Sequence, residues 1–293
     1  DVCPLIPINN VTVDECIEYS HQLAQKVAKK LNIPIFMYEM SATSKDRQNL
    51  AIIRKGEYEG MSEKLKLKKW KPDYGPDKLN IKSGVTAIGV REFLIAYNIN
   101  LNTSDKKIAS DIALDIREAG RAKRDKDGKI IRDNDGVMVK VPGSLKHVKA
   151  VGWFLDEYNV AQVSMNLINY KETPVHKVFE EVRSQAQKRG LRVTGSELVG
   201  LIPLDSLINA GKYYLKQQNK SYGVSDSQLI HIAVKSMGLD EMYEFKSNEK
   251  IIDYMIDDSE KLINKTISNF VDEVASDSPA PGGGSISALA GSL

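Results

Sequence analysis

The sequence predicts an α/β (α+β) protein in which helices flank mixed or antiparallel sheets. Short apolar segments with a period of two alternate along the chain with longer segments whose apolar residues recur every three or four positions. From residue 93 to residue 203 the order is strand, helix, strand, strand, helix, strand, which is the ferredoxin-like split βαβ unit. The 293 residues are enough for two domains, each with its own core.

The composition is that of an ordinary soluble protein, with 42% hydrophobic and 27% charged residues. A formal net charge of +2 gives no general attraction to polyanions. Cys3 and Cys16 both fall in apolar patterns, so we expect small buried side chains rather than a disulfide framework or a metal site. No run of about 18 apolar residues occurs, so no membrane association is expected.

Both ends of the sequence resemble cut ends. The chain begins at Asp1 without a methionine, inside an apolar run, and stops at Leu293 inside a segment of small and apolar residues. We therefore expect truncation at both ends, and the lack of a signal peptide carries no information about location.

The first part of the chain alternates strands and helices. We expect strands at Asp1–Ile8, whose two prolines favour a sheet edge, and at Ile33–Glu39. Thr12-Val13-Asp14-Glu15 is a capping box that begins a helix with an apolar stripe. Two helical pieces, Arg47–Arg54 and Glu57–Leu67, are expected on either side of a glycine.

The stretch from Trp70 to Leu101 combines a loop with two strands. Trp70–Gly84 holds too many prolines and glycines for a helix, whereas Val85–Val90 and Phe93–Leu101 have the pattern of strands. A loop bracketed by glycines is a common ligand site, because bare backbone N–H groups can approach the ligand. A loop that only joins two domains is the alternative. Similarly, Gly56-Glu57-Tyr58-Glu59 could present a carboxylate to a substrate or simply begin a helix.

The second part supplies the split βαβ unit and further helices. Thr173 is expected to cap the second helix of the unit, with Pro174 in its first turn, and the two middle strands meet in a hairpin near Tyr158-Asn159. The expected elements are a strand at Phe93–Leu101, a helix at Ser104–Ala119, strands at Val148–Tyr158 and Ala161–Tyr170, a helix at Pro174–Arg189, a strand at Arg192–Pro203, and helices at Leu204–Gln218, Ser225–Met237, Ile251–Tyr254 and Asp257–Val274. No internal repeat is evident.

Gly120–Lys149 is the most basic part of the chain. A solvated hairpin with turns at Asp127-Gly128 and Asp135-Gly136 is the main interpretation. Arg121, Lys123 and Arg124 flank a helix end and are candidates for attracting an anionic ligand. Nucleic acid is not the expected anion, because aromatic residues are not interleaved with the cations and acids lie among them.

The four histidines show no pair with the spacing of metal ligands, so no metal is expected. His147 enters a strand beside the basic segment and is the histidine that could face a ligand, although a structural role is the alternative. Ser164 and Ser196 have no base or nucleophile-elbow context, so a hydrolase triad is not supported.

A family resemblance covers nearly the whole chain. It is carried by Asp1-Val2-Cys3-Pro4, Gly56-Glu57-Tyr58-Glu59, Trp70-x-Pro72-Asp73-x-Gly75-Pro76, the strand Phe93–Leu101, and Ala161-Gln162-Val163-Ser164-x-Asn166-Leu167. With these residues the chain resembles glutamate formimidoyltransferase, a folate-dependent enzyme of histidine degradation. The resemblance implies two α/β subdomains with a folate cleft between them.

The resemblance also implies where folate is bound. In the family, the loop that matches Gly75–Gly84 lies against the folate, and the two ends of that loop match better than its middle. The implied folate-binding residues are Gly75, Pro76, Asp77, Lys78, Leu79, Asn80, Ile81, Lys82, Ser83 and Gly84. Arg121, Lys123, Arg124 and His147 are the accompanying candidates for steering the glutamate tail of a polyglutamylated folate.

The implied reaction moves a formimino group from N-formimino-L-glutamate to tetrahydrofolate and yields 5-formiminotetrahydrofolate and glutamate. Tetrahydrofolate acts as co-substrate. The histidine that the family uses as acid and base lies just upstream of the stretch matching Asp1–Pro4, so we expect no catalytic residue within this chain. We expect the chain to be inactive alone.

Pro279–Ser285 resembles the opening of formimidoyltetrahydrofolate cyclodeaminase, the helical partner in bifunctional enzymes of this kind. A flexible linker is the alternative. The expected division is an incomplete N-terminal subdomain at 1–92, a C-terminal subdomain at 93–256, a linker helix at 257–278 and a truncated helical stub at 279–293. A bifunctional parent chain, a homo-oligomer and a cytoplasmic location follow as expectations from the resemblance.

Three alternative functions remain open at the level of sequence. Formyl transfer from N-formylglutamate to the same folate would require a similar site. A folate-binding or scaffold module would bind folate without chemistry. An anion-binding or nucleic-acid module would use Arg117–Lys149 and would lose affinity for DNA steeply as salt rises.

Overall fold

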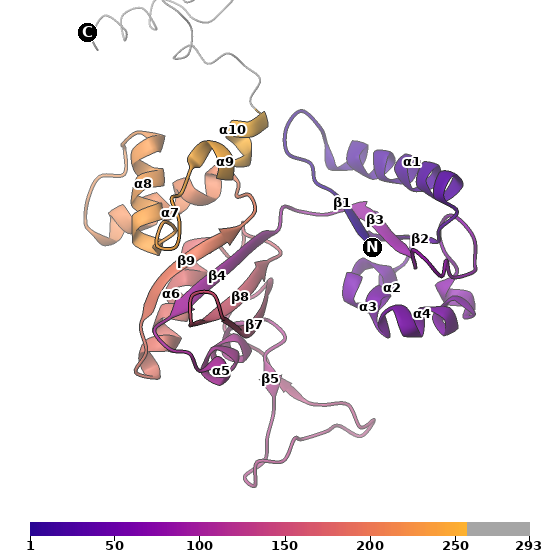
Figure 1. Cartoon of the computed structure of the whole chain (residues 1–293), viewed down its shortest axis with the longest axis horizontal. Helices are drawn as coiled ribbons and strands as arrows, with labels where there is room; N and C mark the ends of the chain where they lie inside the picture. The colour runs from indigo at the N-terminus through magenta and orange to yellow at the C-terminus, as the bar shows by residue number, and fades with distance from the viewer. Residues whose placement is uncertain (257–293) are drawn as a thin grey trace, which may run out of the picture. The chain divides into compact units, whose positions relative to one another are not determined.

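The computed structural model describes residues 1–256, which form two compact units, each with its own sheet (Figure 1). The first unit comprises Asp1–Leu94 together with Lys146–Lys149 and Asn166–Thr173. The second comprises Ile95–Leu145, Ala150–Met165 and, among the described residues, Pro174–Ile256. Parallel and antiparallel sheets occur with helices in one chain, so the predicted α/β class is confirmed.

The first unit is a three-layer sandwich around a parallel sheet in the order β1-β3-β2. Alternate residues of β2 point to opposite faces, so Ile35 and Met37 pack with α1, whereas Phe36 and Tyr38 pack with α3 and α4. The elements are β1 (Val2–Leu5), α1 (Val13–Leu31), β2 (Ile35–Glu39), α2 (Lys45–Gln48), α3 (Leu50–Arg54), α4 (Glu57–Leu65), a short 3₁₀ helix η1 (Lys68–Trp70) and β3 (Thr86–Val90).

In this unit the predicted capping box and the predicted edge strand are confirmed, and one predicted helix is divided in two. Thr12 caps α1 in a capping box with Glu15, and β1, which contains Pro4, lies at one end of the strand order. The helical piece expected at residues 47–54 is broken at Asn49. The side chain of Asn49 accepts a hydrogen bond from the backbone of Ala51 and caps α3, which divides the piece in two.

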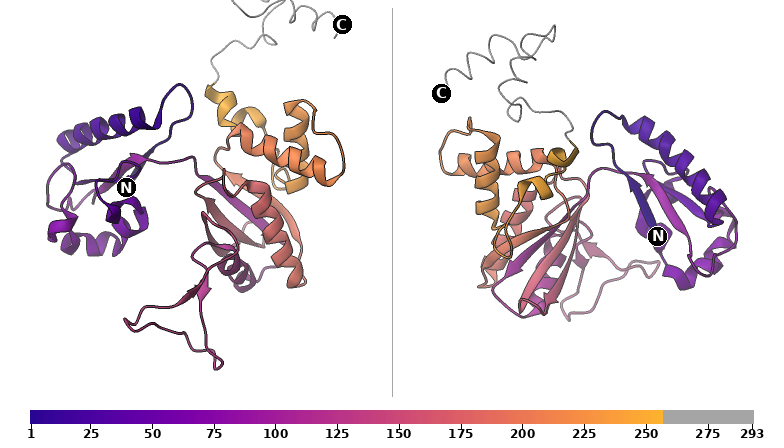
Figure 2. Two further views of the ribbon diagram at one scale, coloured as in Figure 1. Left: turned by 180° about the vertical axis from the view of Figure 1, so that it is seen from behind. Right: turned by 45° about the horizontal axis from the view of Figure 1, so that its top comes forward.

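The second unit carries a four-stranded sheet in the order β7-β8-β4-β9. This is the strand order of the split βαβ unit, as predicted. Helices α5 and α6 lie along one face of the sheet, as the views in Figure 2 show. The elements are β4 (Ile95–Leu101), α5 (Lys106–Ile116), β5 (Arg121–Ala122), β6 (Lys140–Val141), β7 (Val148–Leu155), β8 (Val160–Leu167), α6 (Val175–Lys188), β9 (Val193–Val199), α7 (Leu204–Gln217), α8 (Asp226–Met237), α9 (Ser247–Lys250) and α10 (Ile252–Ile256).

One predicted cap is wrong. Pro174 itself is the N-cap residue of α6 and makes no side-chain cap bond. The hydroxyl of Thr173 instead donates a hydrogen bond of 2.8 Å to the carbonyl oxygen of Lys146. Thr173 is 1% exposed, so a hydrogen bond to a neighbouring segment satisfies its buried hydroxyl.

The predicted helix at 257–274 and the segment 279–293 lie outside the described residues. Among the helices between residues 1 and 256, none is both long and apolar enough to cross a membrane.

Candidate functional site

The loop singled out in the sequence, Gly75–Gly84, leaves the core of the first unit at a buried ion pair. The carboxylate of Asp73 accepts hydrogen bonds from the backbone of Met37 at 2.8 Å and from the hydroxyl of Thr43 at 2.6 Å. The same carboxylate pairs with Arg47 at 2.5 Å, and both side chains of this pair are only 9% exposed. Because a buried charge is tolerated only when it is paired, this cluster fixes the position of the loop's first residues.

Gly75 completes this first anchor. Its φ is +84°, and a Cβ atom at this position would lie 2.3 Å from the carbonyl oxygen of Ile33. Both the left-handed backbone and the close approach require glycine. The preceding residue, Tyr74, also makes a 3.0 Å hydrogen bond with His21.

The second half of the loop is held by Asn80 and Tyr58. The side-chain oxygen of Asn80 accepts hydrogen bonds from the backbone N–H groups of Lys82 and Ser83. Its backbone carbonyl oxygen accepts a third hydrogen bond, of 2.7 Å, from the backbone N–H of Gly84. The Tyr58 hydroxyl donates to the carbonyl of Ile81 at 2.6 Å. The backbone of the loop is therefore held near its start and again between Asn80 and Gly84.

The middle of the loop presents side chains to solvent. Ile81 is 81% exposed, whereas Pro76 and Leu79 are partly buried and Leu79 packs on the core beneath. Within residues 1–256, no hydrogen bond or ion pair is made by the side chains of Asp77, Lys78, Lys82 and Ser83. An apolar side chain, two cations and an anion are thus available to a ligand.

A cavity of about 300 Å³ opens at the end of this loop. Glu57 and Tyr58 at the start of α4 form one side of it, and Arg54 at the end of α3 contributes a guanidinium group. Its lining residues are Asp1, Arg54, Glu57, Tyr58, Met61, Ser83, Gly84 and Val85. The motif at residues 56–59 and the loop, far apart in the sequence, therefore share one site.

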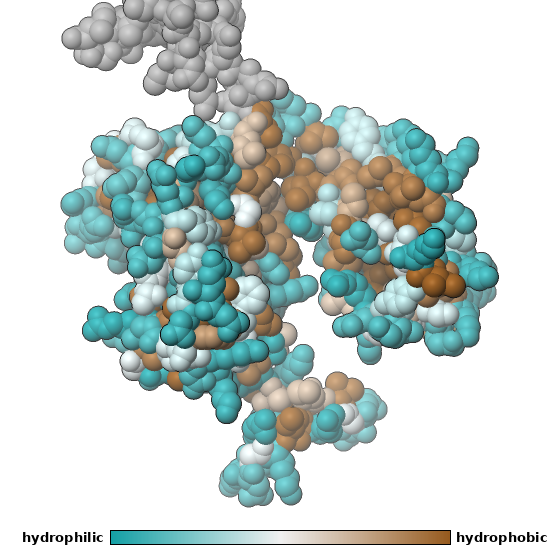
Figure 3. All heavy atoms as spheres, viewed as in Figure 1, coloured by the Kyte–Doolittle hydropathy of each residue, from teal (hydrophilic) through white to brown (hydrophobic). Residues whose placement is uncertain are grey.

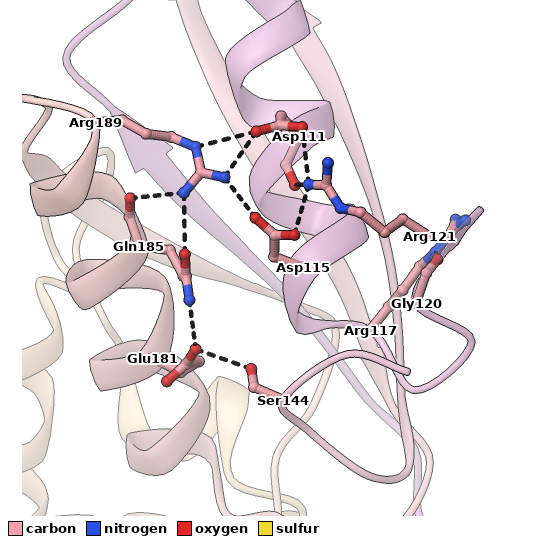
Figure 4. A network of polar contacts seen from close by, with 9 residues as sticks. All are labelled: Asp111, Asp115, Arg117, Gly120, Arg121, Ser144, Glu181, Gln185 and Arg189. Carbon is pink, nitrogen blue, oxygen red and sulfur yellow. Dashed lines mark hydrogen bonds and ion pairs between the residues drawn. The ribbon is translucent and has the colours of Figure 1, made fainter. Parts of the chain in front are cut away.

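The three candidate cations at the start of the basic segment differ in their contacts. The guanidinium of Arg121 donates to the carboxylates of Asp111 at 2.8 Å and Asp115 at 2.6 Å (Figure 4). Arg124 donates to the carbonyl of its own turn, at Gly128, whereas the side chain of Lys123 is exposed. Of the three, Lys123 and Arg124 are the more accessible to an anion.

The ion pairs at Arg121 belong to a larger network. Arg189, the C-cap residue of α6, also pairs with Asp111 and Asp115 of α5, so two carboxylates are shared by two arginines (Figure 4). The hydrogen bond from Arg189, with a smaller contribution from Arg121, lowers the pKa of Asp111 against the opposing effect of burial. The network joins the two helices to β5.

The histidines occupy separate surroundings. His147 has a φ of +56°, and its Nε2 lies 2.8 Å from a carboxylate oxygen of Glu172. His176 stacks on Tyr213 with ring centroids 4.5 Å apart, and burial lowers its pKa. Among the described residues no group of three histidine, cysteine, aspartate or glutamate side chains could hold a metal ion.

Within the basic segment, residues 123–139 form an exposed arm. This arm contains an internal repeat that was not recognised from the sequence. The eight residues Arg124–Ile131 and the eight residues Arg132–Val139 share the order Arg-Asp-x-Asp-Gly, followed by a variable residue and two apolar residues. In each, the arginine donates to the glycine carbonyl and the first aspartate accepts two backbone N–H groups. Figure 3 shows apolar spheres among the polar ones on this arm, where Val137 is 60% exposed.

The repeat closes a ring of backbone hydrogen bonds. Lys123 donates to Val139, Val139 donates to Ile131, and Ile131 donates to Lys123, with distances of 2.8, 3.0 and 2.9 Å. These three residues are spaced by eight positions, so each repeat returns the chain to the same junction. Comparison of the two turns at Asp127-Gly128 and Asp135-Gly136, both of which were predicted, would have revealed the repeat.

A second group of polar residues, also missed, lies on the sheet of the second unit. Trp153 donates to Gln162 at 2.7 Å, Gln162 donates to Asn100 at 2.6 Å, and Asn98 donates to Glu197 at 2.8 Å. Gln162 is fully buried and both asparagines are 3% exposed. In the sequence, this group could have been recognised from Asn98 and Asn100, which occupy alternate positions of the otherwise apolar strand β4 and therefore point to the same face of the sheet.

Comparison with known proteins identifies the family. The family model described as "Formiminotransferase domain" matches residues 96–257, and that of its N-terminal subdomain matches residues 1–91. The chain belongs to the formiminotransferase family. A third family model, "Formiminotransferase-cyclodeaminase", matches residues 266–293. The resemblance predicted from the sequence is therefore confirmed.

Curated relatives agree with this assignment. The formimidoyltransferase-cyclodeaminase of Dictyostelium discoideum is 44% identical over 293 residues, which cover 99% of this chain and 51% of that protein. The protein of the same name from Sus scrofa is 41% identical over 296 residues, which cover 100% of this chain and 51% of that protein. The glutamate formimidoyltransferase of Streptococcus pyogenes serotype M1 is 41% identical over 222 residues, covering 76% of this chain and 67% of that protein. The chain spans about half the length of the first two relatives.

Proposed function

We propose that this chain is part of a glutamate formimidoyltransferase that transfers the formimino group of N-formimino-L-glutamate to tetrahydrofolate, a step of histidine degradation. The observation that carries the proposal is the loop Gly75–Gly84, which is anchored at both ends and exposed in its middle, in a chain of the formiminotransferase family. A fixed backbone with exposed side chains provides a preorganised surface for a flat ligand.

The chemistry requires one proton to move. N5 of tetrahydrofolate attacks the formimino carbon, a new N–C bond forms, and the bond from that carbon to the glutamate nitrogen breaks. The proton of N5 ends on the departing amino group. A group with a pKa near 7 suits both proton transfers.

The resemblance assigns these proton transfers to a histidine just upstream of the position that matches Asp1. Asp1 itself lines the cavity at the end of the loop. None of the four histidines within the 293 residues matches that position.

We further propose that cations on the exposed arm attract the glutamate tail of polyglutamylated folate. Lys123 and Arg124 are exposed, whereas Arg121 and His147 would first have to share their present carboxylate partners. Attraction between solvent-exposed charges weakens with salt, so this contribution falls as ionic strength rises.

The wider expectations also remain proposals. The first is the division of the chain into subdomains with boundaries at residues 92/93, 256/257 and 278/279. The others are a bifunctional parent chain that includes a cyclodeaminase domain, assembly into a homo-oligomer, and a cytoplasmic location. The match of residues 266–293 to a formiminotransferase-cyclodeaminase model supports the bifunctional parent. Formyl transfer from N-formylglutamate and folate binding without chemistry remain the alternative functions.

The folate assignment of the loop is tested by calorimetry with 5-formyltetrahydrofolate, a stable folate. Asn80→Ala removes the acceptor for two backbone N–H groups and should weaken binding about tenfold, because the loop loses its preorganisation. Thr12→Ala is the matched control, since it removes a similar acceptor from the capping box of α1. Equal affinities of the two variants would contradict the assignment.

A further inference from the structure

We propose that the cavity at the end of the loop is the binding site of the formimino donor, with Glu57 holding its formamidinium group and Arg54 holding a carboxylate. This inference rests on the proposed function. The cavity measures about 300 Å³, which is at the small end for ligand sites and suits an amino-acid derivative better than a whole folate. The loop that borders it through Ser83 and Gly84 would place the folate alongside.

The charges that line the cavity are available. Within the described residues the side chains of Arg54 and Glu57 make no hydrogen bond or ion pair, although both belong to the lining and both are exposed. By contrast, Asp73 and Arg47 at the start of the loop are paired with each other and buried. The lining therefore holds one side-chain cation, Arg54, and two carboxylates, those of Glu57 and Asp1, which together match a ligand that carries both signs of charge.

The backbone at Glu57 supports a functional role for its side chain. Gly56 has a φ of +92° and Glu57 has a φ of +52°, so two successive residues are left-handed at the start of α4. Glycine adopts this conformation without penalty, whereas for glutamate it costs about 1 kcal/mol or more. Strain of this kind at a residue that lines a cavity points to a requirement for the side chain.

The donor's chemistry matches the two side chains. A substituted formamidine is a strong base and is a planar cation at neutral pH, with N–H groups that a carboxylate can accept in a bidentate pair. The glutamate part of the donor carries two carboxylates, and a guanidinium group binds such a group in the same geometry. Glu57 and Arg54 together therefore complement the two ends of N-formimino-L-glutamate.

The same contact would distinguish the two possible donors. N-formylglutamate has a neutral formamide, whose carbonyl oxygen would face the carboxylate of Glu57 and be repelled. The neutral analogue also loses the ion pair with Glu57, so attraction to one donor and repulsion of the other both favour the formimino donor. Glu57 would thus determine the preference for formimino over formyl.

Tyr58 links this cavity to the folate loop. Its hydroxyl bonds to the Ile81 carbonyl, and its ring lies 3.4 Å from the Cβ position of Gly84. The residue after Glu57 therefore holds the loop that borders the cavity. Donor and folate would share a wall, which transfer between them requires.

The test uses a chain that also carries the upstream segment with the family histidine. Glu57→Gln keeps the shape of the side chain and removes its charge. We expect kcat/KM for N-formimino-L-glutamate to fall about tenfold or more, the preference over N-formylglutamate to shrink by a similar factor, and the Kd for 5-formyltetrahydrofolate to stay within about twofold. Glu63→Gln, which alters an exposed carboxylate of the same helix outside the lining, is the matched control and should change none of these values.

A second variant separates a structural role from a binding role. Glu57→Gly relieves the left-handed strain, so the melting temperature should stay equal or rise while calorimetric binding of N-formimino-L-glutamate is lost. Arg54→Gln should raise KM for the donor more than it lowers kcat.

The outcomes distinguish this inference from the proposed function. An unchanged donor preference in Glu57→Gln, or unchanged donor binding in Glu57→Gly, would overturn the inference while transfer itself continues. If neither donor is used by the unmutated extended chain, the proposed function fails. In that case, calorimetry still decides the inference: donor binding that Glu57→Gln abolishes supports the subsite, and no donor binding overturns it.

Discussion

Gly75 shows how a single residue determines where the candidate ligand loop begins. The sequence predicted a loop bracketed by glycines, but the reason for glycine lies in a contact with Ile33, 42 positions earlier. The ion pair of Asp73 with Arg47 and the hydrogen bond from Tyr58 to Ile81 also join residues that are far apart in the sequence. Turn chemistry is local and could be predicted, whereas these contacts depend on the tertiary structure.

Gly75→Ala is expected to be among the most destabilising changes in the loop. A methyl group would lie 2.3 Å from the carbonyl oxygen of Ile33 and would also occupy a left-handed backbone. The free energy of unfolding should fall by about 2 kcal/mol or more, as measured by urea denaturation.

Gly128→Ala is the control for this prediction. Gly128 also has a positive φ, but no atom lies within 4 Å of its Cβ position, so only the backbone penalty of about 1 kcal/mol applies. Equal losses for the two variants would show that the contact with Ile33 contributes nothing.

At the scale of the element, the network of two arginines and two aspartates joins α5 and α6. Asp111 lies on α5 at the helix–helix contact, and its partner Arg189, 78 residues away, could not be predicted from any local pattern. The strand order of the second unit was predictable from the order of its segments, whereas the side-chain network between its helices was not.

Asp111→Asn should lower the free energy of unfolding by about 1 kcal/mol at pH 7, a modest figure because the Asp111 side chain is 44% exposed and screened by solvent. The folded-state pKa of Asp111 is lowered, so its contribution is complete above the unfolded pKa of about 3.9 and is lost as the pH falls below it. The difference between variant and parent should therefore vanish in acid, as followed by urea denaturation at several pH values. The control is Asp156→Asn, in an exposed turn, for which the difference in unfolding free energy from the parent should not change with pH. If the difference for Asp111→Asn is as large at pH 2 as at pH 7, the ion pairs of Asp111 are not its cause.

The exposed arm is a second element whose internal structure was not predicted. Its charges predicted a solvated hairpin with two turns, but the ring of hydrogen bonds among Lys123, Ile131 and Val139 depends on a spacing of eight residues. That spacing was visible in the sequence and was overlooked because alternating charge was attributed to solvation.

Deletion of one whole repeat, Arg124–Ile131, should leave the remaining turn able to close on Lys123. We expect the free energy of unfolding to change by less than about 0.5 kcal/mol and the arm to stay resistant to limited proteolysis. Deletion of only four residues, Asp125–Gly128, removes one turn but leaves its flanks, and should make the arm sensitive to protease. Equal sensitivity of the two deletions would show that the repeat is not the structural unit.

At the scale of the whole molecule, two α/β units carry the sequence of the formiminotransferase family. The fold class and the family were predictable because they depend on patterns spread along the entire chain. The cavity beside Glu57 was not, because it brings together residues 54–61 and 83–85, and the sequence cannot show which side chains line a common space.

The central proposal is that this chain carries the folate and donor sites of formimino transfer, and that the histidine implied by the family resemblance moves the proton. The most direct test is the transfer from N-formimino-L-glutamate to tetrahydrofolate, measured on this chain and on a chain extended upstream by the segment with the family histidine. We predict transfer by the extended chain alone. Transfer by both chains would contradict the assignment of the acid and base, and His147 would then be the first residue to replace. Transfer by neither, with folate still bound, would contradict the proposal and favour a folate-binding scaffold.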